Sequence, residues 1–291
     1  MEEDLFKKAA DPVSTDPLDY AAQITSNTVN ELQEHLAESR RLARLLEDLK
    51  TFRNRSLPLH IKSLCDREKE FLKALRGKNH PAITAIEDLY RDMNSRSGSV
   101  IREIPSDLEK LAKSSGLALD FSRSLHPKYY FELGGFIEVE VQDKKLEAKV
   151  STREGILAKL PADAAAIIDV VKQEKKRLFE RSFTGSRLLA DMRIAYSSAI
   201  KTKKAAEGDP IPLRTVHDIM TRKIKDRKGY KSDEFLVDLS KLVIEGPGET
   251  KGYRFELQQT KDTQEGMLLL GEAGRGMVNL LIFKQANTPE L

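Results

Sequence analysis

The stretch that decides the fold is PADAAAIIDVVKQEKKRLFERSFTGSRLLADMRIAYSSAIKTKKAA, residues 161–206. It opens with Pro161 and Asp163, and a proline followed by an acidic residue is typical of a helix start. Apolar residues then recur at steps of three, four or seven, with lysines and arginines largely between them. The spacing predicts a long connecting helix over residues 161–207, buried on one side and basic on the other.

One cluster inside this stretch weakens the helix pattern. Residues 182–186 read Ser-Phe-Thr-Gly-Ser, and serine, threonine and glycine are all poor helix formers. A continuous helix from 163 to 205 would be about 65 Å long at about 1.5 Å per residue. Two interpretations stay open: a single connecting helix, or two helices separated by a kink or break in this cluster.

The composition favours long amphipathic helices. Charged residues make up 33% of the 291 residues, and there is no tryptophan. The single cysteine, Cys65, excludes an intramolecular disulfide, and the five scattered histidines offer no zinc site. The acidic start of the chain is unlike a signal peptide, and no apolar run approaches the roughly eighteen residues of a spanning helix. We therefore expect a cytoplasmic protein without a cofactor, a metal or a membrane segment.

The N-terminal part is predicted to be helical after a flexible arm at residues 1–20. From Ser26 a heptad-like seam runs to Phe52, and shorter helical patterns cover residues 61–75, 81–93 and 106–113. Together they predict a helical bundle over residues 21–128. An antiparallel bundle and a coiled coil are both compatible with the pattern.

Near Tyr129 the period changes to two, which predicts a β-hairpin within residues 129–160. Ile137, Val139 and Val141 alternate with glutamates, and the alternation returns after a polar turn. Because a lone hairpin is marginal in water, we expect this apolar face to pack on the central helix or on the bundle.

A linker at residues 208–212, Gly-Asp-Pro-Ile-Pro, is the boundary that we prefer between domains. Beyond it, residues 208–291 show a helix, a turn, a second helix that Ser232 is expected to cap, and strands around a glycine-rich loop. This order is that of a winged-helix unit. The predicted fold class is mainly α with small β (α+β).

Two motifs suggest chemistry. The loop Gly271 to Gly276 resembles a P-loop, but it lacks the following lysine and serine or threonine, so we interpret it as a hairpin loop. Glu147 and Lys149, with Asp143 and Glu132 upstream, suggest a metal-dependent nuclease. The alternative is a solvated sheet face, on which such a triplet arises routinely.

Charge is the more informative feature. Residues 172–231 contain seventeen lysines and arginines against seven acidic residues, whereas the whole chain carries a net charge of only +3. This asymmetry predicts a basic face for nucleic-acid phosphates or for an acidic protein, with a solvated face as the remaining interpretation. The candidate nucleic-acid-binding residues are Lys175, Lys176, Arg177, Lys201, Lys203, Lys204, Arg222, Lys223, Lys225, Arg227 and Lys228.

The second helix of the C-terminal unit is acidic, with four acidic residues against Lys241: Asp233, Glu234, Asp238 and Glu245. A helix of this charge is a poor reader of the DNA major groove. We expect it to face protein, and any DNA contact to come from the preceding basic helix and the central stretch.

The layout resembles that of kleisin-like or accessory subunits of bacterial SMC- or Rad50-type ATPase complexes. It consists of a helical bundle from Val29 to Leu75, a long connecting helix, and a winged-helix-like unit from Leu213 to Phe283. In that family the two ends grip the coiled-coil neck and the ATPase head, in complexes that maintain chromosomes or defend against plasmids and phages. The hairpin at residues 136–150 is not part of the simplest pattern of the family.

The resemblance implies a non-enzymatic assembly subunit with other protein subunits, an SMC/Rad50-like ATPase among them, as partners. The basic face adds double-stranded DNA as a partner, and self-association into a homodimer stays open. The alternatives are a metal-dependent nuclease centred on Glu147 and Lys149, and a stand-alone DNA-binding regulator.

Overall fold

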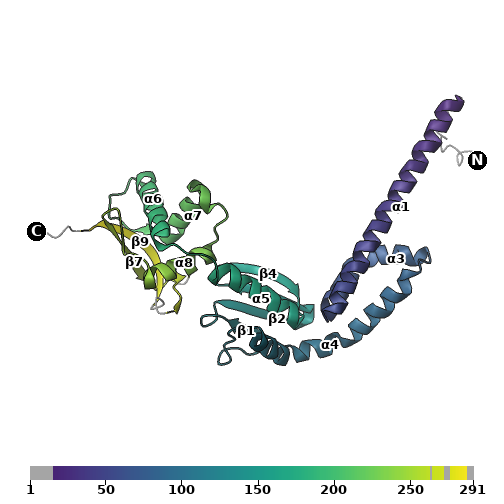
Figure 1. The fold of residues 1–291 in the computed structure, drawn as a ribbon, viewed down its shortest axis with the longest axis horizontal. Coiled ribbons are helices and arrows are strands. Elements are labelled where there is room, and N and C mark those ends of the chain that lie inside the picture. The colour runs from purple at the N-terminus through teal and green to yellow at the C-terminus, as the bar shows by residue number, and fades with distance from the viewer. Residues whose placement is uncertain (1–15, 263, 272–275, 287–291) are drawn as a thin grey trace, which may run out of the picture. The chain divides into compact units, whose positions relative to one another are not determined.

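The computed structural model describes residues 16–262, 264–271 and 276–286, and its fold is mainly α with small antiparallel β-sheets, as the sequence predicts (Figure 1). The chain divides into two compact units, Met1–Ser56 and Leu57–Leu291. The linker at residues 208–212, at which we preferred the main boundary, lies inside the second unit.

The first unit is the helix α1 (Pro17–Asn54). It begins earlier than the predicted Ser26, because the side chain of Asp16 accepts a 2.8 Å hydrogen bond from the backbone amide of Leu18 and Pro17 occupies the first turn. Residues 17–20, expected in the flexible arm, are therefore helical. The rest of that arm lies outside the described residues.

The second unit begins with α2 (Pro58–Arg67), α3 (Lys69–Gly77) and α4 (Ala82–Ser114). The patterns at residues 81–93 and 106–113 form one helix rather than two, although Pro105 lies inside it. Ile101, Ile104 and Leu108 continue one buried face across the proline, so packing outweighs the missing amide hydrogen bond.

The predicted hairpin is confirmed and belongs to a larger sheet. The antiparallel sheet has the order β1 (Lys128–Phe131), β2 (Ile137–Gln142), β3 (Glu147–Thr152) and β4 (Gly155–Pro161), with a short 3₁₀-helix η1 (Asp143–Lys145) in the predicted turn. Ile137, Val139 and Val141 are at most 2% exposed and share a core with residues of α4 and α5, as expected.

The prediction of one long connecting helix is wrong, and the alternative with a break is correct. The stretch forms α5 (Ala164–Phe179) and α6 (Gly185–Lys203), separated at the predicted cluster. A Cβ atom on Gly185 would lie 3.1 Å from Cδ of Pro247 and 3.4 Å from the backbone of Gly246. The missing side chain of Gly185 therefore lets the start of α6 lie close to the turn after α8.

The C-terminal lobe of the second unit packs against one side of α6. It contains α7 (Leu213–Lys223), the 3₁₀-helix η2 (Lys225–Arg227) and α8 (Ser232–Glu245). Its antiparallel sheet has the order β5 (Ile211–Pro212), β9 (Met277–Gln285), β7 (Tyr253–Thr260) and β6 (Glu249–Thr250), and β8 (Met267–Leu268) pairs with β9. The helix-turn-helix, strand, loop and strand expected from the sequence are thus present, although residues 272–275 of the glycine-rich loop lie outside the described residues.

One carboxylate joins the start of α5 to α2. Asp163, which is 2% exposed, precedes α5 but makes no side-chain cap there. Its oxygens instead accept hydrogen bonds from the backbone amides of Leu59 and His60, at 3.1 and 2.8 Å. One of them also lies 2.6 Å from His60 Nδ1. The negative charge therefore stabilises the N-terminus of α2, a helix about one hundred residues earlier.

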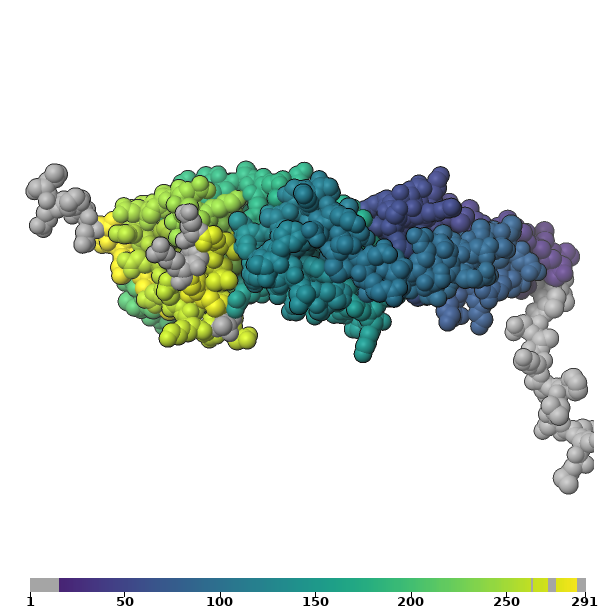
Figure 2. All heavy atoms as spheres, turned by 90° about the horizontal axis from the view of Figure 1, so that it is seen from below, coloured from purple at the N-terminus to yellow at the C-terminus, as the bar shows by residue number. Residues whose placement is uncertain are grey.

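Polar contacts also connect the sheet β1–β4 and the end of α5 to the C-terminal lobe. Arg214 Nη1 lies 2.8 Å from Oε2 of the buried Glu154 carboxylate, and Lys241 Nζ donates a 3.1 Å hydrogen bond to the carbonyl of Phe179. Side chains fill the gap that the ribbon leaves between these lobes (Figure 2). The two lobes therefore form one compact unit.

Candidate nucleic-acid interface

The C-terminal end of α6 carries a group of exposed lysines. Lys201 and Lys203 lie in its last turn, and Lys204 is the C-cap in a left-handed conformation with φ of 52°. Cations are favourable at this end because the helix dipole is negative there. All three ammonium groups face solvent.

The end of α7 adds further cations beside them. Lys223 Nζ donates a 2.6 Å hydrogen bond to Oγ of Ser198, one turn before Lys201, so the ends of α6 and α7 are in contact. We define the basic surface as the exposed cations of these two helix ends and of the turn that follows: Lys201, Lys203, Lys204, Arg222, Lys223, Lys225 and Lys228.

A groove of about 460 Å³ lies next to Lys201. Its lining includes the Ser197 and Ser198 hydroxyls of α6, and Lys251 in the turn between β6 and β7. Arg193 forms one wall, with its guanidinium 3.8 Å from the ring centre of Tyr253. The Arg193 guanidinium is already paired with Glu207 Oε1, at 2.8 Å, which leaves Lys201 and Lys251 as the ammonium groups of the groove. Ammonium and hydroxyl groups donate hydrogen bonds that phosphate oxygens accept, so these side chains suit an anion.

Sequence reasoning did not single out Arg193 or Lys251. Lys251 precedes Gly252 in a tight turn between two strands. A glycine at this place is typical of a turn, so the Lys-Gly dipeptide could have indicated a cation at the end of a hairpin. Arg193 carried no such sign, because its role depends on Tyr253, sixty positions later.

Three of the candidate residues are occupied within the chain. Lys175 Nζ lies 3.1 Å from Glu132 Oε1, and Arg227 Nε lies 2.9 Å from Asp191 Oδ2. Arg177 is bound by acidic residues of α5 and α8. We therefore leave these three out of the basic surface, and Lys176 is exposed on α5, a different element.

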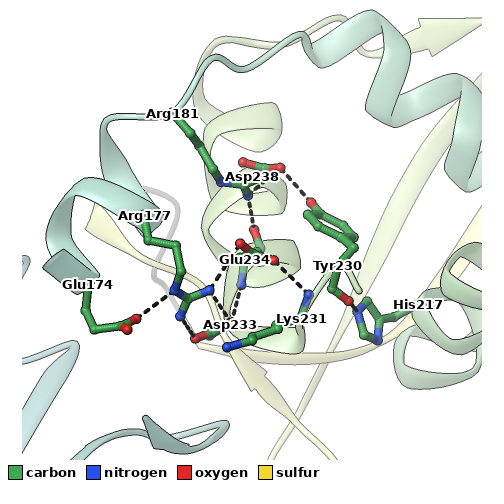
Figure 3. A network of polar contacts seen from close by, with 9 residues as sticks. All are labelled: Glu174, Arg177, Arg181, His217, Tyr230, Lys231, Asp233, Glu234 and Asp238. Carbon is green, nitrogen blue, oxygen red and sulfur yellow. Dashed lines mark hydrogen bonds and ion pairs between the residues drawn. The ribbon is translucent and has the colours of Figure 1, made fainter. Parts of the chain in front are cut away.

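The polar network around Arg177 connects α5 to α8 (Figure 3). Its guanidinium contacts Asp233, Glu234 Oε1 at 3.1 Å and Glu174 Oε2 at 2.7 Å. Burial alone would lower the pKa of Arg177, but the hydrogen bonds with Asp233 and Glu174 raise it overall. Arg177 is thus held charged between three carboxylates.

A second arginine extends the network. Arg181 Nη2 lies 2.7 Å from Asp238 Oδ2, which also accepts a 2.6 Å hydrogen bond from the Tyr230 hydroxyl. Burial, followed by the Asp238 charge, raises the pKa of Tyr230. The Tyr230 carbonyl lies 3.0 Å from Nε2 of His217 on α7, so the network joins α5, α7 and α8.

The network decides what α8 can contact. Eight of its fourteen residues are buried, including Asp233 and Asp238 at 3% exposure. Asp233, Glu234 and Asp238, which we expected to face a protein partner, thus bind arginines of the same chain, whereas Glu245 is exposed. With α5 packed against it, α8 is not placed to enter a DNA groove.

The nuclease motif does not gather at one point. Glu147 and Lys149 are exposed and half-buried on β3, Asp143 lies 2.9 Å from His126 Nε2, and Glu132 is paired with Lys175. In the described part of the chain, no three His, Cys, Asp or Glu side chains form a group that could hold a metal ion.

Comparisons of this chain with protein-family models, with curated proteins and with solved structures found no match. None of the helices in the described residues is long and apolar enough to cross a membrane.

Proposed function

We propose that this protein is a non-enzymatic assembly subunit that contacts double-stranded nucleic acid through its basic surface and joins partner proteins. The observation that carries the proposal is that some cations of this stretch are paired with carboxylates and others are exposed. Arg177, Arg181 and Arg227 are held by carboxylates of the chain, whereas the cations at the ends of α6 and α7 are exposed and adjoin the anion groove.

The C-terminal lobe supports a winged-helix-like unit with an unusual contact face. The order α6, β5, α7, α8, β7 and β9, with β9 between β5 and β7, is the order of such units. Because α8 is covered by α5, the contact runs through α6, α7 and the turn at Lys251. Such a surface meets phosphates rather than base edges, which favours a subunit that binds DNA without sequence preference over a stand-alone regulator.

Other protein subunits are the remaining partners in the proposal. The ATPase of the SMC or Rad50 type follows from the resemblance in layout, from which the single long connecting helix is now missing. A cytoplasmic location suits a nucleic-acid partner and the free, buried thiol of Cys65. Purification with the products of neighbouring genes tests this part: a stable complex supports it, and a protein without a partner but with nuclease turnover overturns it.

Titration of mixed-sequence duplex DNA tests the basic surface. The variant with Lys201→Glu, Lys223→Glu and Lys225→Glu is compared with a control that reverses three exposed lysines of the β1–β4 lobe, Lys144, Lys145 and Lys159. Both variants change the net charge equally. If each lysine neutralises one phosphate, the first variant flattens the slope of log affinity against log salt by about three units.

The control should keep the slope of the wild type. Equal effects of the two triple variants would show that only net charge matters, and would overturn the assignment of the surface. A wild-type protein that does not bind duplex DNA at low salt would overturn the nucleic-acid proposal itself.

A further inference from the structure

The groove beside Lys201 is elongated and has two different walls. Five of its lining residues lie on one face of α6, from Arg193 to Lys201, and therefore span about 12 Å at 1.5 Å per residue. The other wall consists of Lys251, in the turn between β6 and β7, and Tyr253 at the start of β7. A ligand that fills this groove lies along two turns of α6, and its two ends meet different side chains.

The end of the groove at Arg193 is neutral and apolar. Arg193 Nη1 lies 2.8 Å from Glu207 Oε1, so the charge of the guanidinium is compensated within the chain. The guanidinium lies over the Tyr253 ring, and the neighbouring Ile194 side chain is 54% exposed. Nucleobases stack on aromatic rings and on arginine planes, and stacking covers apolar surface. This end therefore suits a base rather than a phosphate.

The end of the groove at Lys201 is cationic. Lys201 and Lys251 are both exposed and belong to opposite walls. Ser198 Oγ accepts the 2.6 Å hydrogen bond of Lys223 Nζ, so the hydrogen of the Ser198 hydroxyl is available for an acceptor in the groove. Two ammonium groups and a hydroxyl can donate to the oxygens of one phosphate. A ligand with a flat apolar group at one end and a phosphate at the other matches both ends.

The size of the groove selects an unpaired strand over a duplex. Its volume of about 460 Å³ falls within the roughly 300–1,000 Å³ of pockets that hold small molecules, so it has room for a nucleotide but not for a duplex. Lys201 belongs to the basic surface as well as to the groove, and a strand that leaves a duplex on that surface reaches the groove directly.

We infer that the groove binds an unpaired nucleotide of a single-stranded tail, with the base on Ile194 and Tyr253 and the phosphate between Lys201 and Lys251. The inference rests on the proposed function, because the basic surface holds the adjoining duplex. It adds the form of nucleic acid that this protein prefers, which is a junction of double and single strand. Stacking is tolerant of sequence, so the tail needs no particular base.

Fluorescence anisotropy of the full chain tests the preference. A blunt mixed-sequence duplex is compared with the same duplex that carries a short single-stranded tail. The tailed duplex should bind about tenfold more tightly, and a tail of the same length without bases should lose most of that gain. Equal affinity for the blunt and the tailed duplex overturns this inference and leaves the proposed function intact. Binding of the tailed duplex without binding of the blunt one overturns the proposed function instead.

A neutral substitution assigns the preference to the groove. Ile194→Ser removes the exposed apolar side chain without changing the net charge, so it should abolish the gain from the tail and keep the affinity for the blunt duplex. Ile244→Ser is the matched control, because Ile244 is 52% exposed on α8 of the same lobe and does not line the groove. A gain that survives Ile194→Ser, or that both variants lose equally, overturns the assignment.

An acidic protein segment is the competing occupant of the groove. A polyglutamate peptide serves as the probe, and it should not displace the tailed duplex more readily from the wild type than from Ile194→Ser. Displacement that depends on Ile194, together with equal affinity for blunt and tailed duplexes, would assign the groove to an acidic protein and overturn the inference.

Discussion

Replacement of Arg177 by methionine should destabilise the second compact unit. Methionine keeps much of the volume of the arginine stem but removes the guanidinium that lies between Asp233, Glu234 and Glu174. The side chain of Asp233 is only 4% exposed, so its negative charge would stay buried with a single remaining hydrogen bond from the amide of Glu234, at 2.8 Å. A buried charge without its partner is among the largest destabilising changes.

The magnitude follows from the burial of the two partners. Breaking a fully buried ion pair costs roughly 3–5 kcal/mol in the free energy of unfolding. Arg177 is 23% exposed, so water can reach the site, and the amide of Glu234 still binds the carboxylate. We therefore expect a loss of about 2–3 kcal/mol. Adding Asp233→Asn to the variant removes the unpaired charge and should recover about half of that loss.

Urea unfolding at neutral pH measures these differences. The matched control is Arg187→Met, because Arg187 pairs with Asp226 at the surface, where the two side chains are 59% and 66% exposed. Such pairs contribute little, so the control should lose less than about 0.5 kcal/mol. Equal losses in the two methionine variants, or no loss in Arg177→Met, would refute the assignment of this network to the stability of the unit.

Ile137→Asp places a charge at a site that is 0% exposed and should lower the free energy of unfolding by about 3 kcal/mol or more. Ile156→Asp, at 55% exposure in the same sheet, is the control and should lower it little. Thermal melting compares the two variants. Asp163→Ala leaves two backbone amides of α2 without their acceptor and should cost about 1–3 kcal/mol in urea unfolding, and an unchanged midpoint would contradict its capping role. Burial raises the pKa of the Cys65 thiol to about 11, so its thiolate fraction is small at pH 8 and grows with pH. Thiol titration should therefore show a slow reaction that accelerates about tenfold per pH unit below that value, and a rate at pH 8 equal to that of the unfolded chain would contradict the burial.

The sheet hairpin and most helix cores could be predicted because their information is local. Ile137, Val139 and Val141 alternate with glutamates over one short segment, and this period of two indicates a β-strand with one buried face. The break between α5 and α6 was visible as Thr184-Gly185 but could not be decided. The local sequence does not show that Gly185 lies against the turn at Gly246 and Pro247, where a Cβ atom would be crowded.

The candidate site could be predicted only in part. The excess of lysines and arginines in residues 172–231 pointed to Lys201, Lys203 and Lys223 and equally to Arg177, because a count of charges does not distinguish exposed cations from paired ones. Only the structure shows that Arg177 meets Asp233, fifty-six positions later, and becomes part of the interior. The acidic surface of α8 and part of the basic stretch thus neutralise each other, which neither segment reveals alone.

The central claim is that duplex nucleic acid meets the ends of α6 and α7. Lysine footprinting measures this most directly: an amine-reactive reagent labels the protein with and without mixed-sequence duplex DNA, and mass spectrometry reads each lysine. We predict protection of Lys201, Lys203, Lys204, Lys223, Lys225, Lys228 and Lys251, with unchanged labelling of Lys144, Lys145 and Lys159. Unchanged labelling of the first group, or protection of the second group to the same extent, would contradict it.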